Sequence, residues 1–193
     1  MPERSGVRDF SGHSAAILWL REEKSRMAMM AGEGRESKKD NDLFYTCSLI
    51  DYIARKTRNI RKEVVNRLGK QRLDKIYDLA DVYHCDNIDR VSDEFIEESG
   101  IKEGSFDNVG ECKYSIPSYW DIGKVYKRLI KMVAVDENIG IIDALMKVYN
   151  SFISAKIDDY NSGVYYETPS YIFESFRECN AVLNHTQVVF CSM

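Results

Sequence analysis

The sequence has few of the residues that interrupt helices, with three Pro and eleven Gly in 193 residues. No apolar run comes near the roughly 18 residues that a transmembrane helix needs. The nearest candidate for a signal-peptide core, residues 15–20, is short and is followed by the charged residues 21–24 instead of a cleavage site. These absences argue against a loop-rich scaffold, a membrane-spanning protein and a secreted protein.

The cysteines lack the spacing of a metal site or a disulfide framework. They lie at positions 47, 85, 112, 179 and 191, with no Cys-x-x-Cys pair and no histidine at zinc spacing. The Gly-Glu-Gly at 32–34 is not followed by the Gly-Lys-Ser/Thr of a phosphate loop, and no Gly-x-Ser-x-Gly is present. We therefore expect free thiols in the cytoplasm, no metal, no cofactor and no recognisable catalytic residue.

The composition is that of a folded globular chain, with 44% hydrophobic and 30% charged residues. A formal net charge of −4 argues against a protein whose whole surface serves nucleic-acid binding. Residues 1–41 are rich in Gly, Ser and charge and predict a flexible extension, within which 14–30 could form one amphipathic helix. Residues 42–185 predict a single helical domain, and 186–193 a tail.

Four short helices are predicted in a first half, residues 42–100. Apolar residues at helical spacing indicate helices at 42–57, 60–68, 71–84 and about 87–99. Asp42 and Asn59 are the expected N-caps of the first two, and Gly69 and Gly100 the expected ends of the second and fourth. Connections of a few residues favour a small bundle.

Longer helices are predicted in a second half, residues 118–183. The segment 101–117 breaks the helical rhythm and could be an irregular loop or a short strand. Ser118 and Asp121 resemble a capping box at the start of the next helix, a further helix is expected over 137–157, and Thr168-Pro169 is a helix start. The fold class is therefore an all-α or mainly α bundle of about six to seven helices.

Charge is strongly segregated along the first half. Residues 55–75 contain nine basic and two acidic residues, whereas 86–111 contain nine acidic and two basic ones. One hypothesis is a charged surface for a protein partner. The alternative is a nucleic-acid-binding regulator that uses 55–75 as a helix-turn-helix, although Asp74, Asp78 and Asp81 would face the phosphates with the wrong sign.

Two smaller groups of residues are candidate sites. His84 and Asp81 share one face of a predicted helix, so a metal site or a small enzyme site there is a third hypothesis, and a helix-end histidine is the alternative. Tyrosines and Trp120 in 114–120, and tyrosines in 160–171, could form an interface or ordinary packing. The candidate partner-binding residues are Arg58, Arg61, Lys62, Arg67, Tyr114, Tyr119 and Trp120.

The stretch 43–96 also carries a family resemblance. Its pattern Phe44-Tyr45-x-Cys47-x-x-Ile50-x-x-Ile53-Ala54, followed by Lys62-Glu63-Val64-Val65, Ile76-Tyr77 and Tyr83-His84, resembles short uncharacterised helical domains encoded beside bacterial ADP-ribosyltransferase-like toxins. The resemblance implies a partner-binding or antitoxin-like role in a bacterial operon and supplies no catalytic residue. A helical protein-interaction module is accordingly the first functional hypothesis, and the junction 101–117 is the first place to look for its site.

Overall fold

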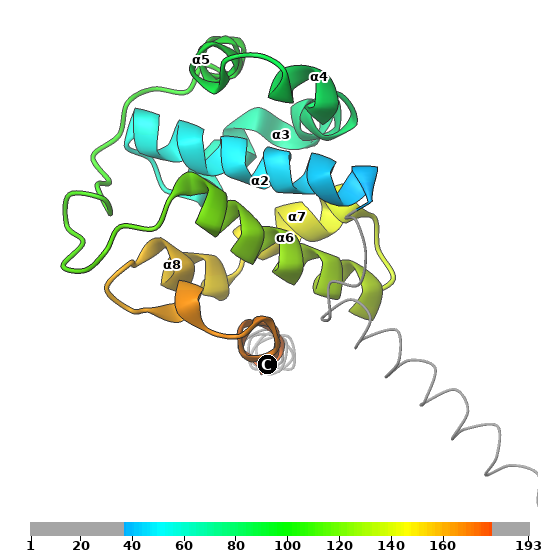
Figure 1. Cartoon of the computed structure of the whole chain (residues 1–193), viewed down its shortest axis with the longest axis vertical. Coiled ribbons are helices and arrows are strands. Elements are labelled where there is room, and N and C mark those ends of the chain that lie inside the picture. Colours follow the sequence, from blue (N-terminus) through cyan, green and yellow to red (C-terminus); the bar gives the residue numbers. More distant parts are fainter. Residues whose placement is uncertain (1–36, 179–193) are drawn as a thin grey trace, which may run out of the picture. The chain divides into compact units, whose positions relative to one another are not determined.

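The computed structural model describes residues 37–178, and from Lys38 onward these residues belong to one compact unit. The described part is built from α-helices and contains no strand, which confirms the all-α prediction (Figure 1). The predicted helix at 14–30 and the tail at 186–193 lie outside the described residues. None of the described helices combines the length and apolar character that crossing a membrane requires.

The first described helix, α2 (Lys38–Thr57), begins four residues before the predicted start. Asp42 is therefore not an N-cap. Its carboxylate is 3% exposed and accepts an ion pair from Lys38, one helical turn earlier. Most of the apolar positions that predicted this helix, among them Cys47, Ile50 and Ile53, are completely buried.

The helix α3 (Arg61–Asp78) contains the kink that the sequence indicates at Gly69, where φ is 70°. A residue with a side chain is strained in this left-handed conformation, so glycine allows the chain to turn between the two halves. The predicted cap was wrong, because Ile60 is the N-cap residue and no side chain caps it. Asn59 instead donates its amide to Thr57 Oγ1 and to the Lys102 carbonyl.

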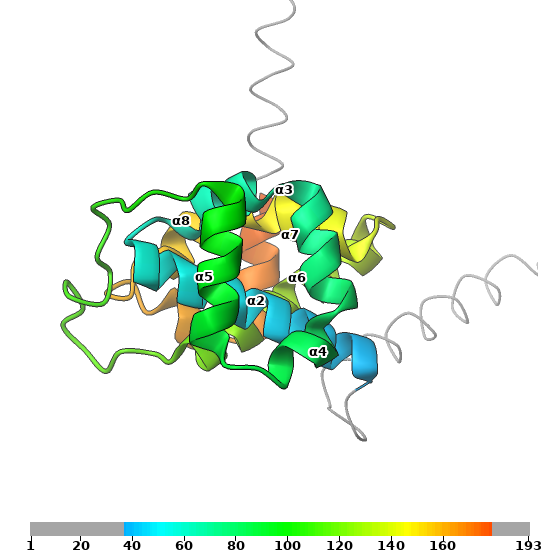
Figure 2. The same cartoon turned by 90° about the horizontal axis from the view of Figure 1, so that it is seen from above.

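The predicted helix 71–84 ends early. Leu79 separates α3 from the short helix α4 (Ala80–His84), so the region forms two elements. The following helix, α5 (Ile88–Ser99), agrees with its prediction: the Asn87 side chain caps it by accepting from Asp89 N, and Gly100 ends it with φ 60°. Figure 2 shows α5 lying across α2, and Figure 1 shows α5 end-on.

The segment 101–117 is irregular and contains no strand. Its first part is tied to the end of α2, where Gly104 N donates to Thr57 O at 2.8 Å and Phe106 N donates to Arg58 O at 2.8 Å. These two bonds hold the loop close to the buried end of α2.

The long helix α6 (Tyr119–Asp136) begins with the predicted capping box, in which Ser118 and Asp121 exchange side-chain and backbone hydrogen bonds. It runs antiparallel to α2 and forms the largest helix pair with it (Figure 1). Gly123 allows this approach, because a Cβ there would lie 3.1 Å from Ser48 N and closer still to Ser48 Oγ.

The predicted helix 137–157 is two helices, α7 (Ile141–Tyr149) and α8 (Phe152–Asp158). Polar side chains compete for the backbone at the break: Ser151 donates to Val148 O at 2.6 Å, and Asn150 donates to Met146 O at 2.8 Å. A 3₁₀ turn, η1 (Val164–Tyr166), follows. Thr168 then caps the last described helix, 169–178, as predicted, by accepting from Tyr171 N.

One hydrophobic core joins the two predicted halves. Residues of α2, α3 and α5 pack in a single cluster with residues of α6, α7, α8 and helix 169–178. The halves 42–100 and 118–183 are thus distinct in sequence pattern, but they share their interior. This arrangement brings the loop 101–117 and the turn after α8 to the same side of the bundle (Figures 1 and 2).

Candidate binding site

Most of the basic segment 55–75 is neutralised within the chain. Seven of its nine basic residues form ion pairs with acidic residues of the described part of the chain: Arg55, Lys56, Arg58, Arg61, Lys70, Arg72 and Lys75. Four of them pair with the acidic segment 86–111, through Lys56–Asp89, Lys56–Asp93, Arg58–Asp107, Arg72–Glu98 and Lys75–Glu98. The segregation seen in the sequence therefore becomes a set of internal contacts between neighbouring elements.

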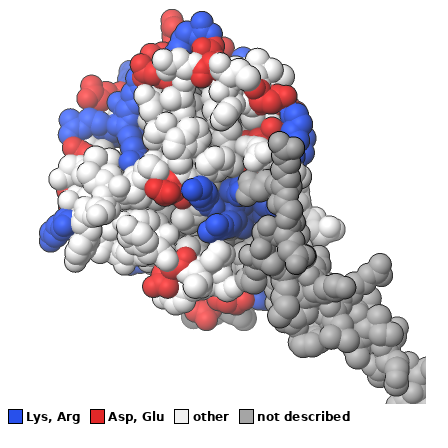
Figure 3. Space-filling model, viewed as in Figure 1, with Lys and Arg blue, Asp and Glu red and all other residues white. Residues whose placement is uncertain are grey.

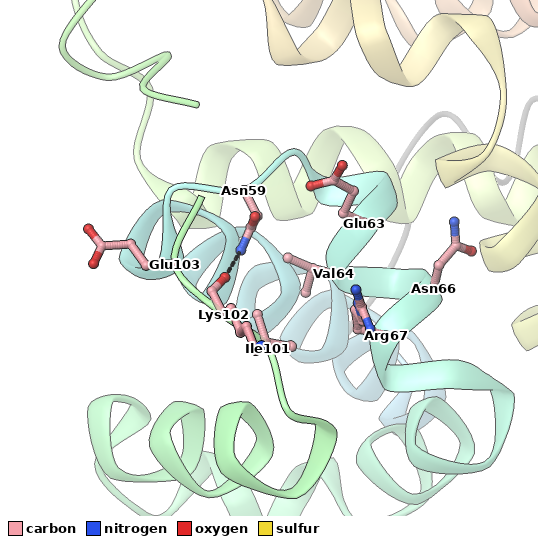
Figure 4. Close-up of a pocket in the computed structure, with 8 residues that line it drawn as sticks. All are labelled: Asn59, Glu63, Val64, Asn66, Arg67, Ile101, Lys102 and Glu103. Carbon is pink, nitrogen blue, oxygen red and sulfur yellow. Dashed lines mark hydrogen bonds between the residues drawn. The ribbon is translucent and has the colours of Figure 1, made fainter. Parts of the chain in front are cut away.

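Lys62 and Arg67 are the two basic residues of the segment that have no such ion pair among the described residues, and both are exposed. Arg67 lines a cavity of about 510 Å³ between α3 and residues 101–103. Figure 4 shows Glu63, Asn66 and Glu103 pointing in different directions around it, while Asn59 binds the Lys102 carbonyl. Because these polar groups do not converge on one point, the cavity has no arrangement suited to chemistry on a bound molecule.

Asp81 and His84 lie on the exposed short helix α4. Asp81 pairs with Lys38 at 3.1 Å, and this hydrogen bond lowers the pKa of the carboxyl group. His84 stands edge-on to the Tyr45 ring at 5.7 Å. Among residues 37–178, no group of three or more His, Cys, Asp and Glu side chains is placed to hold a metal ion.

Arg61 lies in the interior and is 1% exposed, so it is not available to a partner on the surface. Its guanidinium donates to Asp51 Oδ1 at 2.6 Å, to Tyr160 Oη at 2.6 Å, and to Asp158. Arg55 completes the group by donating to Asp51 Oδ2 and to Tyr160 Oη, both at 2.7 Å. Two arginines, two aspartates and a tyrosine thus join α2, the start of α3 and the end of α8. We call them the buried charge network.

The network satisfies its own charges through internal ion pairs and hydrogen bonds. Burial works to lower the pKa of Arg61, but the carboxylates of Asp51 and Asp158 outweigh it and hold that pKa well above the ordinary value. Burial raises the pKa of Asp158 and also that of Tyr160, in each case against the attraction of Arg61. A buried charge is tolerated only when partners and hydrogen bonds compensate for its lost hydration, and every member here has such a partner.

The side of the network that faces the surface leads to a hollow lined by tyrosines. The hollow has a volume of about 710 Å³ and lies between the loop residues 113–115 and the turn 160–166. Its lining residues, which we call the tyrosine trough, are Lys113, Tyr114, Ser115, Tyr160, Asn161, Gly163, Tyr165 and Tyr166. Tyr160 therefore belongs to both the network and the trough.

Hydrogen bonds between the two walls hold the trough in shape. Asn161 accepts from Lys113 N at 2.9 Å and donates to Glu111 O at 3.1 Å. Tyr165 Oη donates to Ser115 O at 3.3 Å, and burial raises the pKa of this phenol so that it keeps its proton. Asn108 ties the same loop to α8 by donating to Asp158 O at 3.0 Å.

The rings of the trough lie at two depths. Tyr160 and Tyr165 are almost completely buried and meet edge to face, with centroids 5.6 Å apart. Tyr166 packs on Tyr165 at 4.3 Å, yet it is 72% exposed, and Tyr114 on the opposite wall is 68% exposed. Figure 3 shows an area of uncharged side chains on one face of the molecule, with charged side chains at its margin.

Tyr119 and Trp120 lie apart from the trough lining. Both are half-buried at the start of α6, where Tyr119 contacts Tyr52 and Trp120 contacts Phe44. Their rings belong mainly to the packing of α6 on α2. Arg58 is half-exposed and holds Asp107 of the loop at 3.4 Å.

Sequence reasoning singled out Tyr114 and noted the tyrosines of 160–171, but it did not bring the two groups together. It also missed Asp51, Asp158 and Asn161. The one available signal was the presence of Asp51 inside an apolar helical stretch, where a charged side chain requires a partner. No protein-family model, curated protein or solved structure matches this chain.

Proposed function

We propose that this chain is a protein-interaction module that binds a partner polypeptide in the tyrosine trough. The observation that carries the proposal is the contrast within the trough: two highly exposed tyrosines, Tyr114 and Tyr166, stand on a rigid base formed by buried residues. Tyrosine gives a large contact area for little lost side-chain freedom, and it is enriched at the energetic centres of interfaces. Tyr166 is held in place before binding by its contact with Tyr165, and an exposed aromatic ring positioned in this way suits this role.

The proposal also covers where the partner is encoded and in which compartment it is met. The resemblance of residues 43–96 to helical domains encoded beside bacterial toxins implies an antitoxin-like component of an operon, acting in the cytoplasm. The three cysteines of the described chain are free thiols, which is compatible with a reducing compartment. The product of the neighbouring gene is therefore the first partner to test.

The proposal is tested by photo-crosslinking from inside the trough. The full chain would carry benzoylphenylalanine in place of Tyr114, and in a matched control in place of Tyr171, which is 55% exposed and does not line the trough. We expect irradiation in cells of the source organism to attach one defined protein at position 114 and not at position 171. The proposal is wrong if the two positions give the same products, or if neither gives any.

Adding Tyr166→Ala to the chain with the crosslinker at 114 gives an independent check. Because Tyr166 forms the opposite side of the trough, its truncation should reduce the yield of the crosslinked partner several-fold. A yield unchanged by Tyr166→Ala would show that the partner contacts Tyr114 outside the trough.

A further inference from the structure

The free groups of the tyrosine trough indicate the chemistry that it can recognise. The hydroxyl of Tyr114 and the ammonium group of Lys113 make no hydrogen bond or ion pair with any described residue, although both residues line the trough. The trough therefore presents two exposed aromatic rings, a hydroxyl group that can donate, and a single uncompensated positive charge. It has no acidic residue in its lining.

A β-strand does not suit this surface. An added strand needs a row of unpaired backbone groups along the edge that receives it. Here Lys113 N already donates to Asn161, and Ser115 O already accepts from Tyr165. The wall 113–115 consequently lacks the row of unpaired backbone groups that an added strand would need.

An amphipathic helix and a nucleic acid fit equally poorly. A helix binds through aliphatic side chains that sink into an apolar groove, and the trough lining contains no Leu, Ile, Val or Met. A nucleic acid strand needs a track of cations along its phosphates. Lys113 is the one cation in the lining.

Resting on the proposed function, we infer that the trough binds a proline-rich segment of the partner in the polyproline II conformation, with an acidic residue beside the prolines. Pyrrolidine rings are compact and apolar and pack between aromatic side chains, here Tyr114 and Tyr166. Prolyl carbonyls accept hydrogen bonds while the segment has few N–H groups to satisfy, which matches a donating tyrosine hydroxyl. The acidic residue would pair with Lys113. Such a segment is extended before binding, so it loses little conformational entropy on a preformed surface.

The test uses short fluorescent peptides with the full chain. The probe has about eight prolines preceded by two glutamates, and its controls are a Gly/Ser peptide with the same glutamates and an all-proline peptide. Fluorescence anisotropy gives the dissociation constants. We expect the acidic proline peptide to bind, the Gly/Ser peptide not to bind at about 1 mM, and the all-proline peptide to bind about threefold more weakly.

Variants of the protein locate the binding. Tyr114→Ala and Tyr166→Ala should each weaken binding of the acidic proline peptide about three- to tenfold. Lys113→Glu should remove the higher affinity that the glutamates give over the all-proline peptide. Tyr171→Ala should leave the dissociation constant unchanged. Tyr114, Tyr166 and Lys113 lie at the surface, so these variants leave the core intact. Circular dichroism would confirm that each one is folded.

The outcomes separate this inference from the proposed function. Crosslinking of a partner from position 114 without proline-peptide binding overturns the inference and leaves the proposed function standing. Peptide binding that is insensitive to Tyr114→Ala and Tyr166→Ala overturns it as well. Trough-dependent binding of an oligodeoxythymidine or of an amphipathic helical peptide, in place of the proline peptide, assigns the trough to another ligand and also overturns it.

Discussion

The hydroxyl of Tyr160 accepts hydrogen bonds from the guanidinium groups of Arg55 and Arg61, and its ring lines the tyrosine trough. At the scale of single residues, this side chain links the interior to the proposed binding surface. Its position follows from Arg61, whose charge lies in the core and is held by Asp51 and Asp158. A buried arginine of this kind is a strong constraint, because removing any partner leaves an uncompensated charge.

Tyr160→Phe tests how much the hydroxyl contributes. The substitution keeps the ring but leaves guanidinium N–H groups of Arg55 and Arg61 without their acceptor. We expect the free energy of unfolding to fall by about 1.5–3 kcal/mol, the range for hydrogen bonds to charged groups. Urea denaturation followed by circular dichroism measures it.

Tyr171→Phe is the matched control, because Tyr171 is 55% exposed and outside the network. It should leave the midpoint of unfolding unchanged within error. If Tyr160→Phe were equally neutral, the buried charge network would not depend on the Tyr160 hydroxyl. The idea that this network positions Tyr160 in the trough would then be wrong.

At the scale of helices, the bundle depends on the close contact between α2 and α6. Gly123 on α6 faces Ser48 on α2, whose hydroxyl donates to Phe44 O at 2.8 Å within its own helix. Glycine is unfavourable inside a helix by about 1 kcal/mol relative to alanine. It occurs here because the two backbones approach too closely for a Cβ.

Gly123→Ala should therefore destabilise the protein despite its better helix propensity. The added methyl group collides with Ser48, and overpacking of this kind costs about 1–3 kcal/mol. Thermal unfolding and urea titration both report the loss.

The double variant Ser48→Ala/Gly123→Ala provides the control. Removing the hydroxyl relieves the shortest contact and should restore part of the stability, although contacts with the Ser48 backbone at 3.1 and 3.2 Å remain. A Gly123→Ala protein that is more stable than the original would show that α2 and α6 separate easily, contrary to this account.

At the scale of the whole molecule, the charges of the chain are largely arranged to bind one another. The basic residues of 55–75 lie on α2, on α3 and on the turn between them, and several meet acidic residues of α5 and of the loop 101–117. These pairs are mostly exposed, so each contributes little to stability on its own. Their effect is to cancel the field that a basic surface would otherwise present.

This cancellation predicts that the segment 55–75 binds nucleic acid weakly and that the binding constant depends only slightly on salt concentration. Within the basic segment, Lys62 and Arg67 alone lack an ion pair with a described residue, so this segment would neutralise at most about two phosphates. Its contribution to the fall of log K with log salt should have a slope no steeper than about −2. Electrophoretic retardation and fluorescence titration of a DNA duplex over a range of salt concentrations measure the slope. Lys62→Glu/Arg67→Glu should abolish whatever binding the segment 55–75 provides.

A slope steeper than about −4 would mean that the internal ion pairs open to bind phosphates, and it would revive the nucleic-acid hypothesis for 55–75. Lys70→Glu is a useful control, since Lys70 is exposed but already paired with Asp143. Its reversal should affect retardation only if such opening occurs.

Several helix ends marked by local signals were predicted well, although the N-caps expected at Asp42 and Asn59 were wrong. Asn87, Gly100, Ser118 and Thr168-Pro169 all act as expected, because caps and breakers act through hydrogen bonds and steric contacts within a few residues. The break between α7 and α8 was missed. Apolar spacing continues through 137–157, and the side chains of Asn150 and Ser151 end α7 by binding backbone carbonyls, which helical periodicity does not reveal.

The sequence by itself determined the all-α class, most helix positions and the irregular break at 101–117, since these depend on periodicity and on contacts between near neighbours. The tertiary structure alone decided which charges meet. Arg61 looked like one more surface cation, yet folding places it beside Asp158, 97 residues away, and out of reach of a partner. The same folding brings Tyr114 to Tyr165 and Tyr166 across the loop and the turn. Contacts between residues distant in sequence depend on how helices pack, and the order of residues along the chain does not record that packing.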